Sequence, residues 1–498
     1  MPDPLARVGL TLFPELRWVL VGLAARLKQR HGSQVHLYCP TAEDVAFHRG
    51  KDREGVFASI GSARRPEQAL PVGGVDEAAE ARSARAWEDR LGVTINRLAM
   101  ANRHLGRGYA LAGPGHPRSR PSEASYGAML AAYNATLESW DREITEKEPT
   151  LVVNGRIELA RLAATRGIPC RFLSSSRWAN LYHWAIDERL ACPAIEARFR
   201  AIEAGPEVTV EAPYALDRTS RADFHAAITR RAVARDALAT VLRHGWGRLR
   251  GHEKARAGYH LGDQVRLLAR RRADWRRLLR VAAPLASLEG QVFVFYALQE
   301  EPEISMGQIS PEFFFQLAAI ASLGRDLPAG VLLAVKETVH AVGRRPRDFY
   351  DQIRALKNVV LLDPREGGIA ARAVATVTGT VGLEAAVMGR PVVAFGSHNL
   401  YDVLGHVHVP GSLADLRPIL DRALDPDFDG AAARAEAARF IAALRAVSFD
   451  LGDYDFKHLK RNVEPAAEAA YQGLVVSLEQ HPIGLDRQGR SADRVKLL

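Results

Sequence analysis

The stretch "VATVTGTVGLEAAVMGRPVVAFG", Val374 to Gly396, decides the fold of this chain. Its opening apolar residues predict a strand, and the small residues after it predict a tight turn followed by a short helix. A Gly-Arg-Pro break then leads into a second apolar run that predicts another strand. A strand, a helix and a strand in this order predict parallel strands joined by a right-handed crossover.

The same alternation occurs on both sides of this stretch. In the second half, "GQVFVFYALQ", "GVLLAVKE" and "VVLLDP" predict buried strands, and "RDFYDQIRALKN" predicts a helix between two of them. In the first half, "RVGLTLF", "QVHLYCP" and "PTLVV" predict strands, and "PELRWVLVGLAARLKQR" predicts a helix. The sequence therefore predicts an α/β fold with two doubly wound, Rossmann-like domains.

The expected boundary between these domains lies near residues 280–290. The expected organisation comprises an N-terminal domain at 1–285, which includes a mainly helical basic segment at about 217–280, a second Rossmann-like domain at 286–445, and C-terminal helices with a polar tail at 446–498.

Composition narrows the class of protein. The chain has 498 residues, of which 47% are hydrophobic and 25% charged, as in soluble globular proteins. Its sequence has no uninterrupted apolar run long enough for a transmembrane helix and no secretory signal at its start. The thiols Cys39, Cys170 and Cys192 lack CxxC spacing, which argues against a disulfide framework and a zinc site. We therefore expect a cytoplasmic protein without a metal or cofactor.

Positive charge is concentrated in one segment. The segment from Arg243 to Arg280 contains 12 Arg and Lys but only 3 Asp and Glu. Its net charge of +9 equals that of the whole chain. Such a segment is either a solvated helical face or a surface that attracts anionic lipid or an acidic polymer. Nucleic acid is the weaker interpretation because no nucleic-acid motif accompanies the segment. Peripheral contact with the inner face of an anionic membrane is thus one expectation.

The turn inside the opening stretch is a candidate binding site, because ligands of open parallel sheets bind at the carboxyl ends of the strands. Gly379 and Gly382 let the backbone approach a ligand, Thr380 can cap the helix or bind a phosphate, and free N–H groups at a helix start favour an anion. Thr378, Gly379, Thr380 and Gly382 together form a candidate phosphate-binding site. Glu384 can accept hydrogen bonds from ribose hydroxyls. The alternative is that Thr380 and Glu384 only adjust the helix end.

Two further strand ends carry charged groups. "FYALQEEPEISM" brings three carboxylates, those of Glu300, Glu301 and Glu303, to the end of an apolar strand. Crowded carboxylates raise one another's pKa toward values useful in acid–base catalysis, although a charged surface loop would look the same. Lys336 ends the next strand and can neutralise a phosphate, unless it is simply exposed.

In the first half, Asn154, Gly155 and Arg156 follow a predicted strand. A guanidinium there can hold an anionic sugar or a phosphate by two-point contact, whereas a simple turn would leave it solvated. Arg177 lies in "LSSSRWANLYHW", whose polar and aromatic groups suit a sugar but also suit a half-buried loop. These four residues are the candidate acceptor or sugar site.

The order "FYALQEEPEIS", "VLLAVKE", "RDFYDQIRALKNVVLLDP" and "VTGTVGLEAAVMGRPVVAFG" resembles the capsule polysaccharide biosynthesis family. Its members include bacterial Kdo transferases and related surface-glycan glycosyltransferases of GT-B architecture. The resemblance covers roughly Gln291 to Leu404, and "GTVGLEAAVMGRPVV" is its most specific part. It implies that Glu384 binds the donor's ribose and that the turn from Thr378 to Gly382 binds the donor's phosphate.

The chain departs from the family at two places. The family often has Gln-Pro-Glu where this chain has Glu301-Pro302-Glu303, so the final Glu is kept. It also often has Lys-Glu-His-Pro where this chain has Lys336-Glu337-Thr338-Val339. The missing His-Pro pair weakens the expectation of a CMP-sugar donor.

The expected function is that of a glycosyltransferase that moves a sugar from a nucleotide-sugar donor onto a capsular or other surface polysaccharide or glycolipid. Glu303 and Glu301 are the expected catalytic carboxylates, with Glu303 first. One alternative is a nucleotide-sugar epimerase of the same architecture, which needs no glycan acceptor. The other is a non-catalytic binding subunit of a glycan assembly or export complex.

Overall fold

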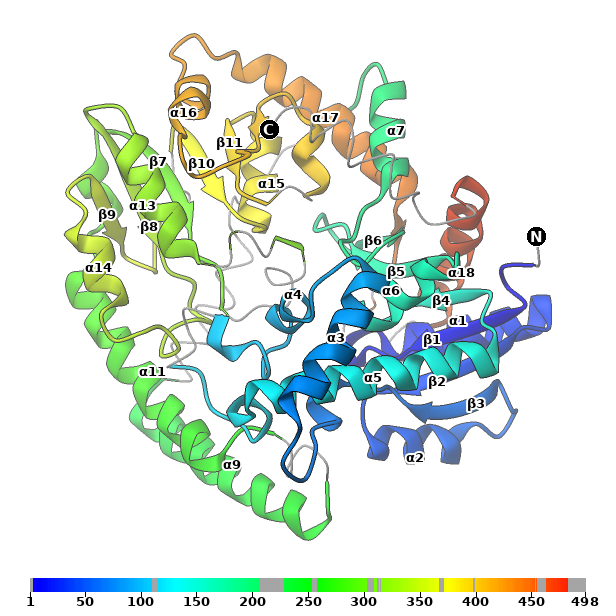
Figure 1. Ribbon diagram of the computed structural model, residues 1–498. Coiled ribbons are helices and arrows are strands. Elements are labelled where there is room, and N and C mark those ends of the chain that lie inside the picture. Colours follow the sequence, from blue (N-terminus) through cyan, green and yellow to red (C-terminus); the bar gives the residue numbers. More distant parts are fainter. Residues whose placement is uncertain are drawn as a thin grey trace. The chain divides into compact units, whose positions relative to one another are not determined.

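The computed structural model describes residues 3–109, 115–206, 228–252, 258–301, 309–310, 313, 315–366, 371–396, 399–452, 454 and 463–481. The chain divides into two compact units. Unit 1 comprises Met1–Leu98, Ala124–Ala201 and Ala443–Leu498, and unit 2 comprises Ala99–Glu123 and Ile202–Ala442. Each unit contains its own sheet with helices packed on it (Figure 1). This confirms the predicted fold class, an α/β chain with two doubly wound, Rossmann-like units.

The sheet of unit 1 has seven strands in the order β13-β6-β5-β4-β1-β2-β3. Pairs among β1 to β5 are parallel, whereas β6 pairs antiparallel with both β5 and β13. The strands are β1 (Arg7–Thr11), β2 (Gln34–Cys39), β3 (Phe57–Ser62), β4 (Leu151–Val153), β5 (Cys170–Ser175), β6 (Leu181–Ala185) and β13 (Phe449–Asp450).

Helices cover this sheet and share its core. The helices are α1 (Arg17–His31), α2 (Ala42–Lys51), α3 (Glu77–Leu91), α5 (Tyr126–Lys147), α6 (Ile157–Thr165), α7 (Pro193–Ala201) and α18 (Val463–Gln480). Helix α4 (Ile95–Met100) crosses the division between the units. Leu10 of β1, Leu20 of α1 and Leu474 of α18 are fully buried in one core. Helix α1 ends at Gly32, whose φ of 63° is the left-handed conformation that glycine adopts without strain.

The last helix returns to the first one. Helix α18, red in Figure 1, packs along α1, blue, where a Cβ on Gly22 would lie 2.6 Å from the Cβ of Ala467. Arg26 and Arg30 of α1 both bind the carboxylate of Glu468, at 2.7 and 2.8 Å. The C-terminal segment expected at 446–498 therefore belongs, in its described part, to unit 1.

The sheet of unit 2 has six strands in the order β12-β11-β10-β7-β8-β9, and all its pairs are parallel. The strands are β7 (Val292–Ala297), β8 (Val331–Lys336), β9 (Val359–Leu362), β10 (Ala373–Thr376), β11 (Val392–Ala394) and β12 (Val407–His408). The helices are α9 (Arg230–Leu249), α11 (Leu261–Val281), α13 (Gln316–Asp326), α14 (Phe349–Ala355), α15 (Thr380–Val387) and α16 (Arg417–Ala423), and α17 (Gly430–Val447) crosses the division between the units. The chain starts at the central strand β7, moves outward to β9, and then returns to the other side of β7 for β10.

The basic segment is helical, as predicted, within α9 and α11. The expected domain boundary near 280–290 falls inside unit 2, because Trp275 and Leu278 of α11 are buried in the same core as Val294 of β7. Apolar contacts of α11 thus decide to which unit the segment belongs. No helix among the described residues is long and apolar enough to span a membrane.

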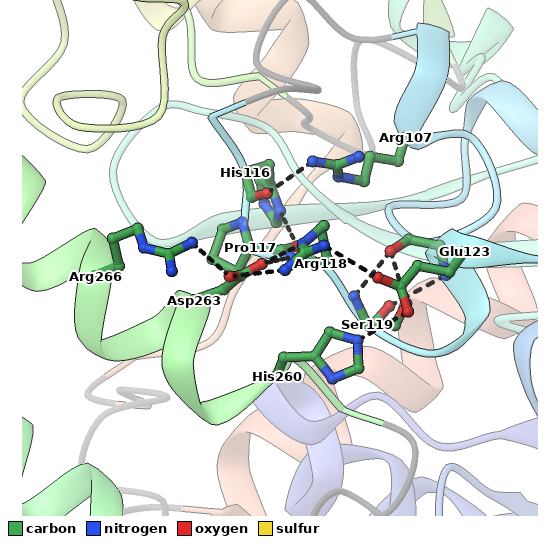
Figure 2. A network of polar contacts seen from close by, with 10 residues as sticks. Arg107, His116, Pro117, Arg118, Ser119, Glu123, His260, Asp263 and Arg266 are labelled. Carbon is green, nitrogen blue, oxygen red and sulfur yellow. Dashed lines mark hydrogen bonds and ion pairs between the residues drawn. The ribbon is translucent and has the colours of Figure 1, made fainter.

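The segment 99–123, which was expected to belong to the N-terminal domain, belongs to unit 2, and residues of its described part are bonded to the start of α11 (Figure 2). Arg118 donates from its backbone N and its Nε to Asp263 Oδ2, at 2.9 and 2.8 Å, and its carbonyl accepts from His260 N at 2.7 Å. Hydrogen bonds and the charge of Arg118 lower the pKa of Asp263 to about 2. An ion-pair network therefore holds this segment in unit 2.

Candidate functional site

The switch point of the unit 2 sheet lies between β7 and β10. The chain leaves these adjacent strands toward opposite sides of the sheet, and ligands of such sheets bind in the crevice that this creates at the carboxyl ends. Leu298 and Gln299 follow β7, and Val377, Thr378 and Gly379 follow β10. The stretch predicted to carry the catalytic carboxylates and the turn predicted to hold the donor's phosphate thus meet at one edge of the sheet.

Gln299 joins these two strand ends. Its side-chain amide contacts Thr378 Oγ1 at 3.1 Å, and with the amide oxygen turned toward the β10 turn it accepts from Thr378 N at 3.0 Å. Gln316 of α13 fixes the backbone of Gln299, because its Oε1 accepts from Gln299 N at 2.7 Å and its Nε2 donates to Gln299 O at 3.0 Å. The amide oxygen of Gln299 therefore lies where an acceptor oxygen of a ligand would meet the turn.

The turn before α15 differs in detail from the sequence-based expectation. Gly379 is the N-cap of α15 and Thr380 is the first helical residue, so the Thr380 side chain does not cap the helix. Gly379 N donates to Thr376 Oγ1 at 3.1 Å. A Cβ on Gly382 would collide with Tyr401, whose hydroxyl donates to Gly379 O at 3.3 Å. Gly382 thus leaves room for Tyr401, a residue that was not predicted from the sequence.

Glu384 lies on the second turn of α15 and is half-buried. Thr378, one residue before the N-cap, is 3% exposed. Thr378, Gly379, Thr380 and Glu384 therefore share one turn and one helix at the switch point, as the sequence predicted. Their ligand-binding roles remain predictions.

The carboxylates after β7 have separate surroundings. Glu300 forms an ion pair with Arg344, whereas Glu301 is fully buried, with Oε2 at 3.4 Å from Arg345 Nη1 and Oε1 accepting from Gln316 Nε2 at 2.5 Å. Burial raises the pKa of Glu301. Glu303 lies outside the described residues. Glu301 therefore anchors the end of β7 inside the unit.

The residues after β8 are also part of the interior. Lys336 is 7% exposed, and its Nζ donates to Glu366 O at 2.9 Å. Glu337 is 1% exposed and accepts from Arg345 and from the hydroxyl of Tyr350, the latter at 3.0 Å. Lys336 thus contacts the chain that follows β9, and Glu337 contacts the chain that follows β8. Arg345, which binds both Glu301 and Glu337, has no signal in the sequence because its two partners are 44 and 8 positions away.

In unit 1, Asn154, Gly155 and Arg156 follow β4, beside the central strand β1, at the corresponding switch point. Asn154 has a φ of 52°, and its Oδ1 accepts from Leu173 N at 2.8 Å, so it fixes the turn against β5. Burial lowers the pKa of Arg156, but the carboxylates of Glu158 and Glu67 outweigh this effect, so the pKa is raised overall. The Arg156 guanidinium is thus held as a cation at this edge.

Arg177 lies beyond β5, in the turn to β6. Its φ is 58°, and its backbone N donates to Ser175 Oγ at 3.1 Å. The neighbouring His183 contacts Ser176 Oγ through Nδ1 at 3.0 Å, and burial lowers the pKa of His183 to about 4. The sequence left this stretch as either a site or a half-buried loop, and the structure shows an antiparallel hairpin. Among the described residues, no group of three or more His, Cys, Asp or Glu side chains is arranged to hold a metal ion.

Comparison with known proteins gives structural matches only. No family model and no curated protein matches the sequence. One solved structure that is similar to this chain is MnaA of S. aureus with UDP. The sequence identity is 10% and the TM-score is 0.28, and the match covers 89% of this chain and 95% of that one. Another is UGT2 of Phytolacca americana with UDP-2-fluoro-glucose and pterostilbene, at 12% identity and a TM-score of 0.26, covering 96% and 100%.

A third solved structure is the N-terminal domain of trehalose-6-phosphate phosphatase from Candida albicans, at 9% identity and a TM-score of 0.31, covering 94% and 96%. At these identities and TM-scores, the likeness assigns no activity to this chain.

Proposed function

We propose that the chain is a glycosyltransferase that moves a sugar from a nucleotide-sugar donor to a capsular or other surface glycan or glycolipid. One observation carries this proposal: the end of β7 and the turn between β10 and α15 meet at the switch point of a parallel sheet, where Gln299 contacts Thr378. The sequence of the same turn resembles the donor-binding stretch of GT-B glycosyltransferases. The position of this turn at the switch point supports the donor-binding role that its sequence suggests.

In this proposal the nucleotide binds to unit 2. Backbone N–H groups at the start of α15 bind the donor's phosphate, since a helix N-terminus favours an anion. The Gln299 amide oxygen accepts a hydrogen bond from Thr378 N, and a phosphate oxygen of the donor replaces it as the acceptor. Glu384 accepts hydrogen bonds from ribose hydroxyls. The same N–H groups stabilise the negative charge that develops on the leaving nucleotide.

The catalytic carboxylate in this proposal is Glu303, on the chain that follows β7. Glu301, fully buried and bound to Arg345 and Gln316, acts as a positioning residue for that chain. Lys336, held by the Glu366 carbonyl, positions the end of β8. Asn154, Gly155, Arg156 and Arg177 of unit 1 contribute to acceptor or sugar binding.

The experiment is a turnover assay on the purified full chain. UDP-, GDP- and CMP-sugars are supplied with and without acceptor extracted from membranes, and free nucleotide and altered sugar are measured. We expect nucleotide release that depends on the acceptor. Sugar conversion without acceptor would identify an epimerase instead, and nucleotide binding without turnover would identify a binding subunit.

Two Glu→Gln variants test in the same assay whether the proposed ribose-binding residue is needed. Glu384→Gln alters the residue proposed to bind the ribose. Glu289→Gln alters an exposed carboxyl before β7, at the opposite end of that strand, and serves as the matched control. We expect loss of turnover at low donor concentration only in Glu384→Gln.

A further inference from the structure

Helix α9 exposes a stripe of large apolar side chains. Five of the twelve large hydrophobic side chains exposed among the described residues lie on its last three turns. They are Leu238 (61% exposed), Val241 (43%), Leu242 (63%), Trp246 (57%) and Leu249 (85%). Scattered single exposures are ordinary on protein surfaces, but a contiguous apolar patch marks an interaction site.

The stripe follows the helical repeat and faces away from the rest of unit 2. Leu238, Leu242, Trp246 and Leu249 are three or four positions apart, and Val241 lies three positions after Leu238, so all five line one face of α9. The buried residues of α9 are Ala232 and Gly247. Gly247 is nine positions from Leu238, about two and a half turns, and so lies on the opposite face. Helix α9 packs beside α11 (Figure 1), which leaves the stripe open to solvent.

Positive charge surrounds the stripe. The exposed charged side chains of α9 and its C-cap are six arginines: Arg230, Arg231, Arg235, Arg243, Arg248 and Arg250. The acidic residue of the helix, Asp236, is half-buried and paired with Arg235 at 3.1 Å. The guanidinium of Arg250 lies over the ring of Trp246, 4.5 Å from its centroid. The surface is therefore apolar along its centre and cationic at its margins.

We propose that α9 lies flat in the interface of a lipid bilayer that contains anionic lipid, with the five apolar side chains inserted among the acyl chains near the headgroups. Amphipathic helices with arginine on the polar face and Trp and Leu on the other bind membranes in this way. Arg and Trp side chains also suit the headgroup region, where a polar tip stays hydrated above an apolar body.

Charge argues against the main competing occupant, a second copy of this chain. Two α9 helices packed through their stripes would bring two sets of six exposed arginines together, and like charges at an interface are unfavourable. Anionic headgroups instead complement these arginines. The inference goes beyond the proposed transferase activity and is independent of it, because it concerns a surface of unit 2 and not the switch point.

Flotation of the full-length protein with vesicles tests the proposal. We expect binding to vesicles of phosphatidylcholine and phosphatidylglycerol in equal amounts, with much weaker binding to phosphatidylcholine alone and with weakening as salt is raised. Leu242→Asp with Trp246→Asp should lower binding at least ~10-fold, because the inserted apolar area is lost. The control variants Val72→Asp and Val476→Asp change exposed valines elsewhere, 93% and 47% exposed, and should bind as the parent does.

Two further variants separate the contributions of charge and insertion. Arg243→Gln with Arg248→Gln should lower binding to the anionic vesicles and reduce its dependence on salt. Trp246→Phe should keep binding but lose most of the quenching of tryptophan fluorescence by lipids brominated near the headgroup. Turnover with a soluble acceptor should be unchanged in all α9 variants, so failure of the proposed function would leave this test intact.

Three results would overturn the proposal. The first is a parent protein that does not float with anionic vesicles. The second is a Leu242→Asp, Trp246→Asp variant that floats as well as the parent. The third is a parent that is dimeric by light scattering and becomes monomeric in this variant without vesicle binding, which would make the stripe an interface between copies.

Discussion

Arg345 and Glu337 form an ion pair that is almost completely removed from solvent. Arg345 Nε lies 2.9 Å from Glu337 Oε2, and the two side chains are 1% and 0% exposed. Arg345 also lies 3.4 Å from Glu301. Burial opposes its charge, but the two carboxylates raise the pKa of Arg345, so the guanidinium stays protonated. One arginine thereby joins the chain after β7 to the chain after β8.

Arg345→Met should destabilise the protein by about 3 to 5 kcal/mol, since removal of one member of a buried ion pair leaves the others uncompensated. The measurement is denaturant unfolding of parent and variant at pH 7. Arg417→Met is the control, because the Arg417–Asp421 pair is 58% and 50% exposed and contributes about 0 to 1 kcal/mol. Equal losses in the two variants would contradict the interpretation.

The Arg118–Asp263 contact makes the docking of segment 99–123 depend on pH. The pKa of Asp263 falls from 3.8 to about 2, so its ionised form stabilises the folded state. This contribution is fully present above the unfolded value of about 4 and is lost as the pH falls through about 2.

Asp263→Asn should therefore lower the free energy of unfolding by about 1 to 2 kcal/mol at pH 7 and by roughly half of that at pH 3. Denaturant unfolding at both pH values measures the two differences. Asp421→Asn, which changes a half-exposed partner of Arg417, is the control. A difference between parent and Asp263→Asn that stays constant down to pH 3 would show that the carboxylate charge is not the cause.

Glu384→Ala should weaken binding of a ribonucleoside diphosphate about 10-fold, the expected loss for hydrogen bonds to a charged group. If Glu384 binds the ribose, the parent prefers the ribonucleotide to its 2′-deoxy analogue and the variant does not. Calorimetric titration of both ligands against both proteins gives the four affinities. A variant that retains the parent's preference would remove the ribose assignment.

Gly382→Ala should destabilise unit 2 by about 1 to 3 kcal/mol, because the added methyl group meets Tyr401 and lies 2.8 Å from Thr376 Cγ2. Tyr401→Phe removes the nearest atom, so the same change should be less destabilising in that background. A double-mutant cycle of the four unfolding free energies measures this coupling. Additive effects would mean that the methyl group is accommodated elsewhere.

The sequence predicted the elements whose pattern is local. Strands β10 and β11 each have an unbroken apolar run, and α15 between them has a clear helical stretch. The structure contains all three elements. It did not predict β3, because "FASIGS" is an edge strand with little apolar character. Nor did it predict β6, because that strand pairs antiparallel within a stretch rich in polar residues.

The site was predicted in part for a similar reason. Thr378 and Gly379 come just after β10, and Glu384 lies on the helix that follows, so reading along the chain is enough to locate them. Gln299 also follows a strand, but its role depends on Thr378, which is 79 positions away. Tyr401 fills the space beside Gly382 only after β11 has been placed next to β10. Contacts of this kind depend on the tertiary structure and leave no local pattern.

The packing of α18 on α1 affects the order in which the two units can fold during synthesis. The ribosome makes α1 before most of unit 2 and α18 after it, so the apolar face that Leu474 covers in the core of unit 1 stays open while unit 2 is synthesised. Unit 2 can complete its sheet first, although it begins later. The core of unit 1 is therefore complete only once α18 has been synthesised, and not when the first half of the chain emerges.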